Sequence, residues 1–297
     1  MRVAVTGASG FVGGAVATAL AHRGHAVTGF GRTPHGWDGP YEVWDITRGT
    51  HGGRFDVVVH SAALADDWAP LGVAMLANRI GTRNVIASFP TARMIHISTS
   101  SVYDTFTPHV RVREDAGPAA RFLSTYAESK AAAEAEHDTD AVILRPHAVY
   151  GPGDTTLLPR ILAGIRGRRL VLPEGAAVSH TLTHIDNLVD AVELSLTGPA
   201  GIYNIGDDTD VLLSAVLTEF LHRRGRADVT LTSIPYRAAF TAAAALEKLH
   251  RAVGGRPRIT RYAVSQLGLE RTFDLTAART ALGYNPTPTT LAGAEVW

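Results

Sequence analysis

A glycine turn at the N-terminus constrains the fold of this chain more than any other feature. The apolar run at residues 2–6 leads into Gly7-Ala8-Ser9-Gly10-Phe11-Val12-Gly13, and a helical pattern follows over residues 13–22. In such a turn one glycine permits the tight bend, the next lets backbone N–H groups approach a diphosphate, and the third lets the helix pack on the strand. The diphosphate then lies at the positive end of the helix dipole. The segment predicts a dinucleotide-binding strand–turn–helix with contacts from Gly7, Gly10, Phe11, Val12 and Gly13.

Strand and helix patterns alternate through the first half of the chain. Helical patterns cover residues 71–89 and 125–137, and strand-like apolar runs lie at 25–30, 41–44, 55–60, 94–98 and 141–144. The run at 55–60 contains three successive valines, Val57 to Val59, which is typical of a parallel strand buried on both faces. This repeated β–α–β order predicts an α/β fold with a Rossmann-type, doubly wound parallel sheet.

The pattern loosens after residue 152, where prolines and an arginine-rich stretch at 160–169 indicate a separate lobe. An amphipathic helix at 185–196 and a short strand at 201–205 are expected to rejoin the main sheet. We therefore expect residues 1–152, with 184–206, to form the nucleotide-binding domain. Residues 153–183 and 207–297 are expected to form a smaller substrate-binding lobe, with helices at 212–223 and 238–252 and then a turn-rich tail.

Composition excludes several classes of function. The 28 basic and 28 acidic residues cancel, which argues against a general affinity for nucleic acid or anionic membranes. The absence of cysteine excludes disulfides, thiolate metal sites and a cysteine nucleophile, and we expect no metal site. No apolar stretch reaches the ~18 residues that a membrane span needs. We expect a cytoplasmic protein whose partner is a small-molecule substrate.

The end of the second strand bears on the choice of dinucleotide. An acidic residue there would favour NAD, whereas this chain has Arg32, whose guanidinium can pair with the 2′-phosphate of NADP. NADP(H) is the preferred cofactor, and NAD(H) stays possible because Arg32 could simply stack on adenine. Asp45 could accept a hydrogen bond from the adenine amino group or cap a helix. The cofactor site is also expected to include Ile46, Ala62, Ala63, Pro146 and Val149.

Tyr126 and Lys130 lie four residues apart, so they project from one face of the expected helix. A phenol with a pKa near ~10 becomes a useful acid–base group when a neighbouring ammonium stabilises its anion. Only two of the 28 basic residues are lysines, Lys130 and Lys248, which adds weight to this pair. Hydroxyl groups at residues 98–101, at the end of the expected strand at 94–98, could hydrogen-bond a substrate oxygen.

Together these segments resemble the extended short-chain dehydrogenase/reductase superfamily, also called the NAD(P)-dependent epimerase/dehydratase superfamily. The matching motifs follow in order along essentially the whole chain: TGASGFVG, DVVVHSAA, NRIGTRNV, ISTSSVY, YAESK and LRPHAVYGPGD. The resemblance implies a Rossmann core with a C-terminal substrate lobe, usually in a homodimer. It also implies a catalytic set of Thr99, Tyr126 and Lys130, and cofactor contacts from Tyr126 and Lys130.

Particular positions discriminate between branches of this superfamily. Dehydratases carry an Asp-Glu pair after the threonine, where this chain has Ser100 and Ser101, so elimination lacks a proton carrier. Nucleotide-sugar epimerases place an arginine where this chain has His180, and a neutral imidazole replaces a bidentate guanidinium poorly. Four later segments are similar to the 3β-hydroxysteroid dehydrogenase-like group, which includes 2-alkyl-3-ketoalkanoate reductases. They are GPGDTTLLPRIL, THIDNLVDAV, PRITRYAVSQL and FDLTAARTALGYNP.

The sequence therefore predicts an NAD(P)-dependent oxidoreductase that transfers hydride between nicotinamide and a secondary alcohol or ketone. The expected substrate is apolar, of the β-keto or β-hydroxy type, and its candidate contacts are Trp68, Ser100, Leu157, Leu158, Val178 and His180. A nucleotide-sugar epimerase or 4-ketosugar reductase is the first alternative. A non-catalytic NADP-binding sensor is the second.

Overall fold

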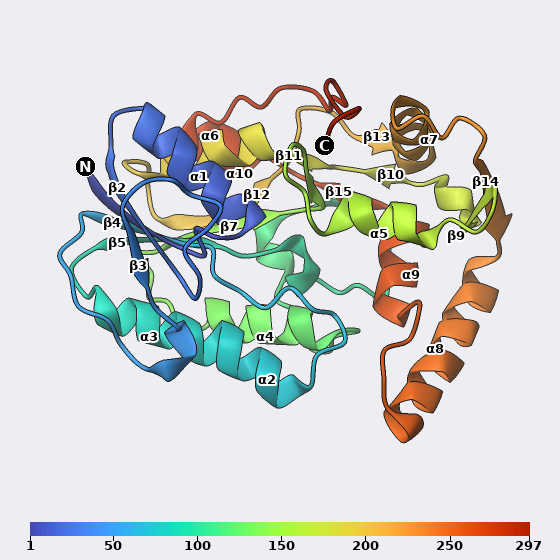
Figure 1. The fold of residues 1–297 in the computed structure, drawn as a ribbon, viewed down its shortest axis with the longest axis horizontal. Helices are drawn as coiled ribbons and strands as arrows, with labels where there is room; N and C mark the ends of the chain where they lie inside the picture. The colour runs from blue at the N-terminus through green and yellow to red at the C-terminus, as the bar shows by residue number, and fades with distance from the viewer.

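Seven parallel strands form the central sheet of the computed structural model, which describes residues 1–297 (Figure 1). From one edge to the other they are β12 (Gly201–Ile205), β7 (Val142–Pro146), β5 (Arg93–Ile97), β4 (Val57–His60), β1 (Arg2–Thr6), β2 (Ala26–Gly31) and β3 (Tyr41–Val43). The chain order reverses between β1 and β4, and this switch point is where open α/β sheets bind ligands. The predicted fold class is confirmed.

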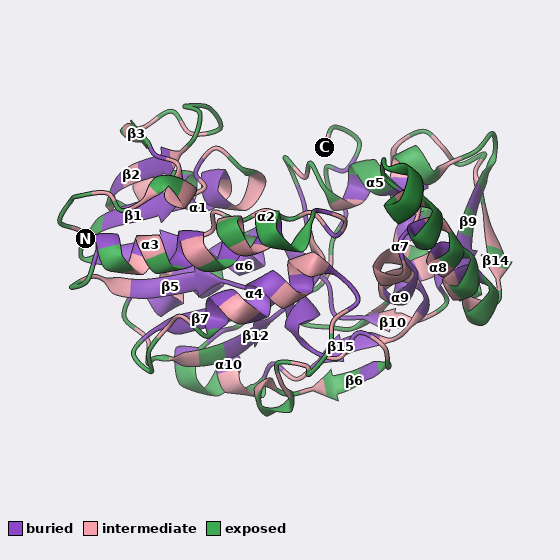
Figure 2. Ribbon diagram, turned by 90° about the horizontal axis from the view of Figure 1, so that it is seen from below, coloured by how far each residue is buried: buried purple, intermediate pink, exposed green.

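Helices cover both faces of this sheet. On one face lie α1 (Phe11–His22), α6 (Ile185–Ser195) and α10 (Thr276–Leu282); on the other lie α2 (Leu71–Met75), α3 (Gly81–Ser88) and α4 (Thr125–Glu134) (Figure 1). All four residues of β4 are buried as a result. Figure 2 shows the same burial along the inner strands, and it explains why their residues are mostly apolar.

A second group of elements lies beyond the carboxyl ends of the central strands. Its four-stranded sheet has the order β13 (Val211–Leu212), β10 (Ser179–His180), β15 (Arg271–Phe273) and β6 (His109–Val112). Two strand pairs accompany it, β8 (Val149–Tyr150) with β11 (Thr183–His184), and β9 (Arg169–Pro173) with β14 (Thr230–Ile234). The helices of this part are α5 (Leu157–Gly164), α7 (Leu213–Arg223), α8 (Tyr236–Val253) and α9 (Arg261–Gly268).

The two parts exchange segments more than the sequence suggested. Strand β12 pairs in parallel with β7, as expected for the segment that rejoins the sheet. Strand β6, from the first half of the chain, pairs instead with β15 in the smaller sheet. Beyond α8 the chain is more than a turn-rich tail: α9 and β15 form, and Leu275, Ala278 and Leu282 join the main hydrophobic core.

The predicted helix at 71–89 is interrupted. Between α2 and α3 a π-helical turn covers Leu76–Ile80 and buries Asn78. A π turn inserts an extra residue into the helix and often lies at a functional site. The amide of Asn78 hydrogen-bonds both backbone groups of Leu64 and the hydroxyl of Ser129. The turn therefore joins the loop after β4 to helix α4.

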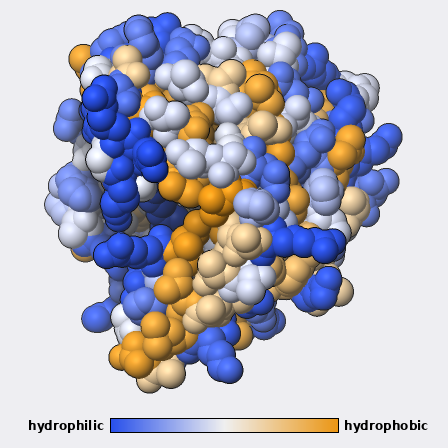
Figure 3. Space-filling view, turned by 90° about the vertical axis from the view of Figure 1, so that its right-hand side faces the viewer, coloured by the Kyte–Doolittle hydropathy of each residue, from blue (hydrophilic) through white to orange (hydrophobic).

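Helix α8 lies at the outside of the smaller part, with its C-terminal end exposed (Figure 1). Leu249 and Val253 on this helix are exposed, and an apolar band crosses the face of the molecule shown in Figure 3. None of the helices combines the length and the apolar character that crossing a bilayer requires.

A buried ion pair lies beneath α4. The guanidinium of Arg145 on β7 donates to both carboxylate oxygens of Glu134, at 2.7 and 3.0 Å, and to the hydroxyl of Tyr103. The side chains of Arg145 and Glu134 are 0% and 5% exposed. Ser98 also donates to Glu134. This network fixes the C-terminal end of α4 against the ends of β5 and β7.

We expect Arg145→Met to lower the free energy of unfolding by about 3–5 kcal/mol, because it leaves the buried carboxylate of Glu134 without its cationic partner and with only the hydroxyl of Ser98 donating to it. Urea unfolding followed by circular dichroism at pH 7 measures the change. The matched control is Arg2→Met, which breaks the exposed Arg2–Asp56 pair and should cost less than about 1 kcal/mol. Equal losses in the two variants would contradict the assignment of the buried pair.

Candidate active site

The predicted site residues lie at the carboxyl ends of the central strands, and so at the same end of the sheet. Six of the seven strands have a predicted residue at or just after that end: Gly7 after β1, Arg32 after β2, Asp45 after β3, Ala62 after β4, Thr99 after β5, and Pro146 at the end of β7. Ala63 is exposed beside Ala62, and Val149 begins β8. One parallel sheet thus collects residues that are far apart in the sequence.

The glycine turn has the geometry that a diphosphate site needs. Gly7 has a φ of +74°, and a Cβ there would lie 2.7 Å from the backbone nitrogen of Ala62. A Cβ on Gly13 would overlap the carbonyl oxygen of Gly7. Gly10 is the exposed N-cap of α1, which has neither a side-chain cap nor an acidic residue in its first turn. The first N–H groups of α1 are therefore open to an anion.

Arg32 and Asp45 differ in how far they are engaged. The side chain of Arg32 is exposed and makes no hydrogen bond or ion pair within the protein. Asp45 caps a 3₁₀ turn at Ile46–Arg48, where its carboxylate accepts from the backbone nitrogen and the hydroxyl of Thr47. These hydrogen bonds lower the pKa of Asp45. Ile46 packs over Gly81.

Tyr126 and Lys130 lie on α4, as the spacing predicts. Ser124 caps this helix by accepting from the backbone nitrogen of Ala127. Lys130 is 2% exposed, and its Nζ donates to the carbonyl oxygen of Ile97 at 2.8 Å and to Nε2 of His96 at 2.6 Å. The ammonium therefore ties α4 to the end of β5.

Thr99 and Tyr126 meet at this end of β5. Burial raises the pKa of Tyr126, and a hydrogen bond with Thr99 opposes the shift. Thr99 Oγ1 also donates to Ser101 Oγ at 3.1 Å and accepts from the backbone nitrogen of Ser101. A phenol with a raised pKa keeps its proton at neutral pH, so Tyr126 is suited to donate it to a developing alkoxide.

Tyr262 is a member of this hydroxyl cluster that the sequence did not reveal. It lies in α9 of the smaller part, and its hydroxyl is 2.6 Å from Ser101 Oγ. Burial raises its pKa, and both Tyr126 and Asp67 lie close enough to raise it further. Only the fold brings Tyr262 to Ser101, because the two residues lie 161 positions apart in the chain.

Ser100 and His180, both predicted substrate contacts, are joined by a third residue. Ser100 Oγ lies 2.9 Å from Nδ1 of His147, and Nε2 of His147 lies 3.2 Å from Nδ1 of His180. Burial lowers the pKa of His147 well below its usual value and that of His180 to about 3. Both imidazoles are therefore neutral at physiological pH.

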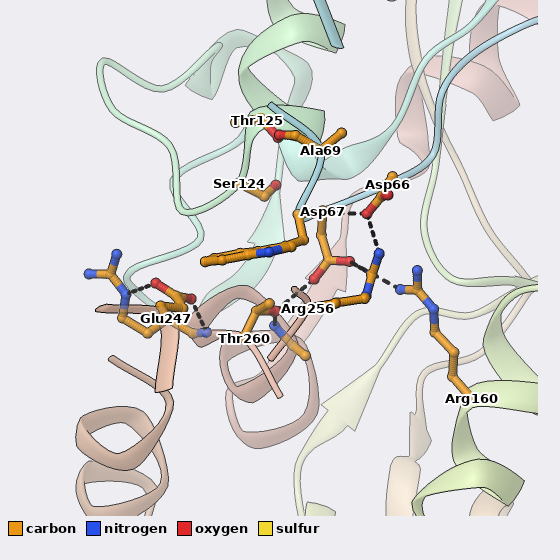
Figure 4. A network of polar contacts seen from close by, with 12 residues as sticks. Asp66, Asp67, Ala69, Ser124, Thr125, Arg160, Glu247, Arg256 and Thr260 are labelled. Carbon is orange, nitrogen blue, oxygen red and sulfur yellow. Dashed lines mark hydrogen bonds and ion pairs between the residues drawn. The ribbon is translucent and has the colours of Figure 1, made fainter. Parts of the chain in front are cut away.

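The loop after β4 is held by the smaller part. The buried carboxylate of Asp67 accepts from Thr260 at 2.7 Å and Arg256 at 2.7 Å, with Arg160 at 3.4 Å (Figure 4). In the same loop, the indole of Trp68 donates to the carbonyl oxygen of Gly255. The backbone of Ala69 accepts from Thr125 at the start of α4 (Figure 4). The loop and its partners thus join the two parts beside Tyr126.

The other three apolar substrate candidates, besides Trp68, belong to the smaller part. Leu158 is 6% exposed and packs in a hydrophobic cluster with Tyr150, Leu182 and Phe220. Leu157 packs against the same cluster and is half-buried. Val178 is half-buried next to β10. No three His, Asp or Glu side chains come together in a way that could hold a metal ion.

A model of the NAD dependent epimerase/dehydratase family matches residues 3–206, more than two thirds of the chain. The chain belongs to this family. The match begins in β1 and ends with β12, so it spans the whole parallel sheet. Membership confirms the predicted superfamily and the nicotinamide dinucleotide as its class of cofactor.

Relatives in this family include two named reductases. The 2-alkyl-3-oxoalkanoate reductase of Shewanella oneidensis is 31% identical over 95% of this chain and 81% of its own length. The 4-hydroxy-2-methyl-3-oxo-4-farnesyl-3,4-dihydroquinoline-1-oxide ketoreductase of Stigmatella aurantiaca is 31% identical over 96% of this chain and 92% of its own. Both names support the predicted branch, and they confirm the predicted class, a dehydrogenase or reductase.

Solved structures of the family share the fold. MoeE5 in complex with UDP-glucuronic acid and NAD superposes with a TM-score of 0.71, at 23% identity, over 99% of this chain and 96% of that chain. At this level of identity the likeness supports the arrangement of sheet and lobes.

Lys130 should give this family member a characteristic pH dependence. Burial lowers the pKa of its ammonium to about 8, and Glu134 partly opposes the shift. We expect the charge to stabilise a Tyr126 phenolate below pH 8 and this stabilisation to be lost as the pH rises through 8. We expect the initial rate of ketone reduction to fall over that interval. In Lys130→Arg the guanidinium stays charged above pH 8. The remaining activity of this variant should therefore not fall near pH 8. A wild-type rate that stays constant to pH 9.5 would contradict this.

Proposed function

We propose that this protein is an NAD(P)-dependent ketoreductase that transfers hydride between nicotinamide and a secondary alcohol or ketone of an apolar β-keto or β-hydroxy substrate. The Thr99 and Tyr126 hydroxyls lie together one helical turn from Lys130, whose buried ammonium is held by His96 and Ile97, and this arrangement supports the proposal. This group lies at the carboxyl end of the sheet, where the glycine turn leaves the first backbone N–H groups of α1 free to donate to a diphosphate. The catalytic residues are Thr99, Tyr126 and Lys130.

The chain's own residues have separate tasks in this reaction. A bound nicotinamide cofactor supplies or accepts the hydride. Tyr126 donates its proton to the substrate oxygen as that oxygen gains negative charge, and Thr99 donates a hydrogen bond to the same atom. Lys130 stabilises the phenolate and holds the cofactor ribose. In reduction, one ketone, one hydride and one proton give one alcohol, so each turnover requires a proton from solvent.

The cofactor is assigned as NADP(H) in preference to NAD(H). The free guanidinium of Arg32 supports this, because it lies at the end of β2 with no protein partner and no carboxylate replaces it there. Gly7, Gly10, Phe11, Val12 and Gly13 would hold the diphosphate. The rest of the cofactor site is proposed at Asp45, Ile46, Ala62, Ala63, Tyr126, Lys130, Pro146 and Val149.

The apolar substrate class rests on the named reductases and on what the site lacks. Ser100 and Ser101 stand where dehydratases carry acids, and they bond to His147 and Tyr262 instead. His180, in the place of the epimerase arginine, is buried. Three of the predicted contacts are half-buried, and we propose them as walls of the substrate pocket: Trp68, Leu157 and Val178. The buried Ser100, Leu158 and His180 are proposed to lie behind these walls.

Cofactor oxidation on a panel of ketones tests the activity. We expect NADPH consumption with apolar β-keto acids or cyclic ketones, and a fall of about 10²–10⁴-fold in Tyr126→Phe, which removes the proton donor. Tryptophan fluorescence should show that the variant still binds NADPH. Turnover confined to nucleotide 4-keto sugars, with binding of UDP, would move the assignment to the sugar-modifying alternative. Full activity in Tyr126→Phe would contradict the mechanism.

The cofactor preference has its own test. Arg32→Ala should raise the KM for NADPH by about 10-fold or more, because a charge-assisted hydrogen bond to phosphate is worth ~1.5–3 kcal/mol. The KM for NADH should change by less than about twofold, which controls for folding. Equal changes for both cofactors would show that Arg32 only stacks on adenine.

The proposal extends to assembly, organisation and location. We propose a homodimer. The exposed side chains of Leu71, Val73 and Leu76, on one helical stretch, support it.

We propose that the chain divides by function into a nucleotide-binding domain, residues 1–152 with 184–206, and a substrate lobe, residues 153–183 with 207–297. A cytoplasmic location, where reduced nicotinamide cofactors are available, completes the proposal.

A further inference from the structure

Four hydroxyl groups form a hydrogen-bonded row at the carboxyl end of β5, and the last of them comes from the smaller part. Tyr126 hydrogen-bonds Thr99, and Thr99 Oγ1 lies 3.1 Å from Ser101 Oγ. At the other end of this hydroxyl row, the hydroxyl of Tyr262 lies 2.6 Å from Ser101 Oγ. The reaction proposed above gives tasks to Tyr126 and Thr99 and leaves the roles of Ser101 and Tyr262 open.

The start of α9 holds Tyr262 in a fixed position. Thr260, the N-cap of this helix, donates to the buried carboxylate of Asp67 at 2.7 Å. The backbone nitrogen and the guanidinium of Arg261 donate to Glu247 on α8, at 2.7 and 2.8 Å, and this glutamate is 3% exposed. Because both contacts directly precede Tyr262 in the chain, they present its hydroxyl to the row in one place.

The chemistry of Tyr262 suits it to be the first donor of the row. Burial raises the pKa of its phenol, so the group keeps its proton at neutral pH and can donate it in a hydrogen bond. Its hydroxyl bonds to Ser101. A serine hydroxyl carries one proton and two lone pairs, so Ser101 can accept from Tyr262 while it donates to Thr99.

Since each hydroxyl has a single proton, a bound ketone determines the direction of the row. In the proposed reaction Thr99 donates to the ketone oxygen, so its proton is no longer available to Ser101. The contact between Thr99 and Ser101 then persists only with Ser101 as the donor, and the contact between Ser101 and Tyr262 only with Tyr262 as the donor. Thr99 Oγ1 can accept this bond, because one of its two lone pairs accepts from the backbone nitrogen of Ser101 and the other is free. These changes are rotations about C–O bonds, so no proton leaves its oxygen and the row resets when the product leaves.

We propose that Tyr262 is a positioning residue that acts through Ser101 to orient the hydroxyl of Thr99 toward the substrate oxygen. This inference rests on the reductase reaction proposed above. With a ketone bound, the donors run from Tyr262 to Ser101, then to Thr99 and the ketone oxygen, and each bond polarises the next. The aligned dipoles stabilise the negative charge that develops on this oxygen as hydride arrives. Because Tyr262 belongs to the smaller part, the orientation of Thr99 depends on that part being docked on the loop after β4.

Tyr262→Phe keeps the ring and removes the first donor of the row. We expect kcat with the preferred ketone to fall by about five- to tenfold, because one neutral hydrogen bond is lost. The KM for the ketone should change by less than about twofold, because the uncharged substrate gains little from the row. The matched control is Tyr236→Phe, which removes a phenol hydroxyl from α8, where the ring packs on Phe240, and should leave kcat unchanged. An unchanged kcat in Tyr262→Phe would overturn the proposal.

A double-mutant cycle separates action through Ser101 from direct contact with the substrate. Ser101→Ala interrupts the row, so adding Tyr262→Phe to this variant should change kcat by less than about twofold. A residue that contacts the substrate directly, or that only supports the fold, would lower kcat by the same factor in both backgrounds. That result would overturn the proposal.

A second measurement does not depend on turnover, because an ionised Tyr126 can take the place of the negative substrate oxygen as the acceptor from Thr99. The pKa of Tyr126 can be followed by NMR of ¹³Cζ-labelled tyrosine from neutral to alkaline pH, with Tyr126→Phe identifying its signal. Tyr262→Phe should raise this pKa, and it should not do so in the Ser101→Ala background. A pKa of Tyr126 that does not respond to Tyr262→Phe would overturn the row. If no ketone is reduced while the pKa responds as expected, the proposed function fails and the row stands.

Discussion

The buried ammonium of Lys130 is the contact on which the arrangement of the active site depends. It donates to the backbone carbonyl of Ile97 and to His96, both on β5. Burying a charge is costly unless it is well hydrogen-bonded, so these two bonds fix how α4 sits against the sheet. Tyr126, one helical turn earlier, is thereby held next to Thr99, the second residue after β5. The Glu134–Arg145 pair fixes the other end of the same helix.

The smaller part of the molecule completes the site from the opposite side. Asp67, in the loop after β4, receives Arg256 and Thr260 from the segment between α8 and α9 (Figure 4). Tyr262, two residues after Thr260, then reaches Ser101 beside Thr99. A single short segment therefore both attaches the smaller part to the loop and delivers a phenol to the hydroxyl cluster. This arrangement explains why residues of the last quarter of the chain contribute to a site built on a sheet.

Local patterns predicted the parts of the site that depend on local geometry. The glycine turn, the Tyr126–Lys130 spacing and the central strands are each set within a few residues, and the sheet then aligns their ends. Tyr262 and His147 could not be predicted, because their roles arise from contacts between distant segments. His96 did leave a signal: it is the one polar residue inside the otherwise apolar run Met94–Ile97. The π turn at Asn78 left none, because a single inserted residue does not disturb an apolar helical pattern.

In the proposed reaction, hydride passes from the nicotinamide to the carbonyl carbon of a ketone substrate, and the alcohol is released as the product. The most direct test is a reaction with NADPH deuterated on the transferred position of C4, followed by mass spectrometry and NMR of the organic product. We predict one deuterium on the new carbinol carbon, with one equivalent of NADP⁺ released per molecule of product. A product that carries no deuterium at that carbon, formed while the cofactor pool remains reduced, would contradict the account.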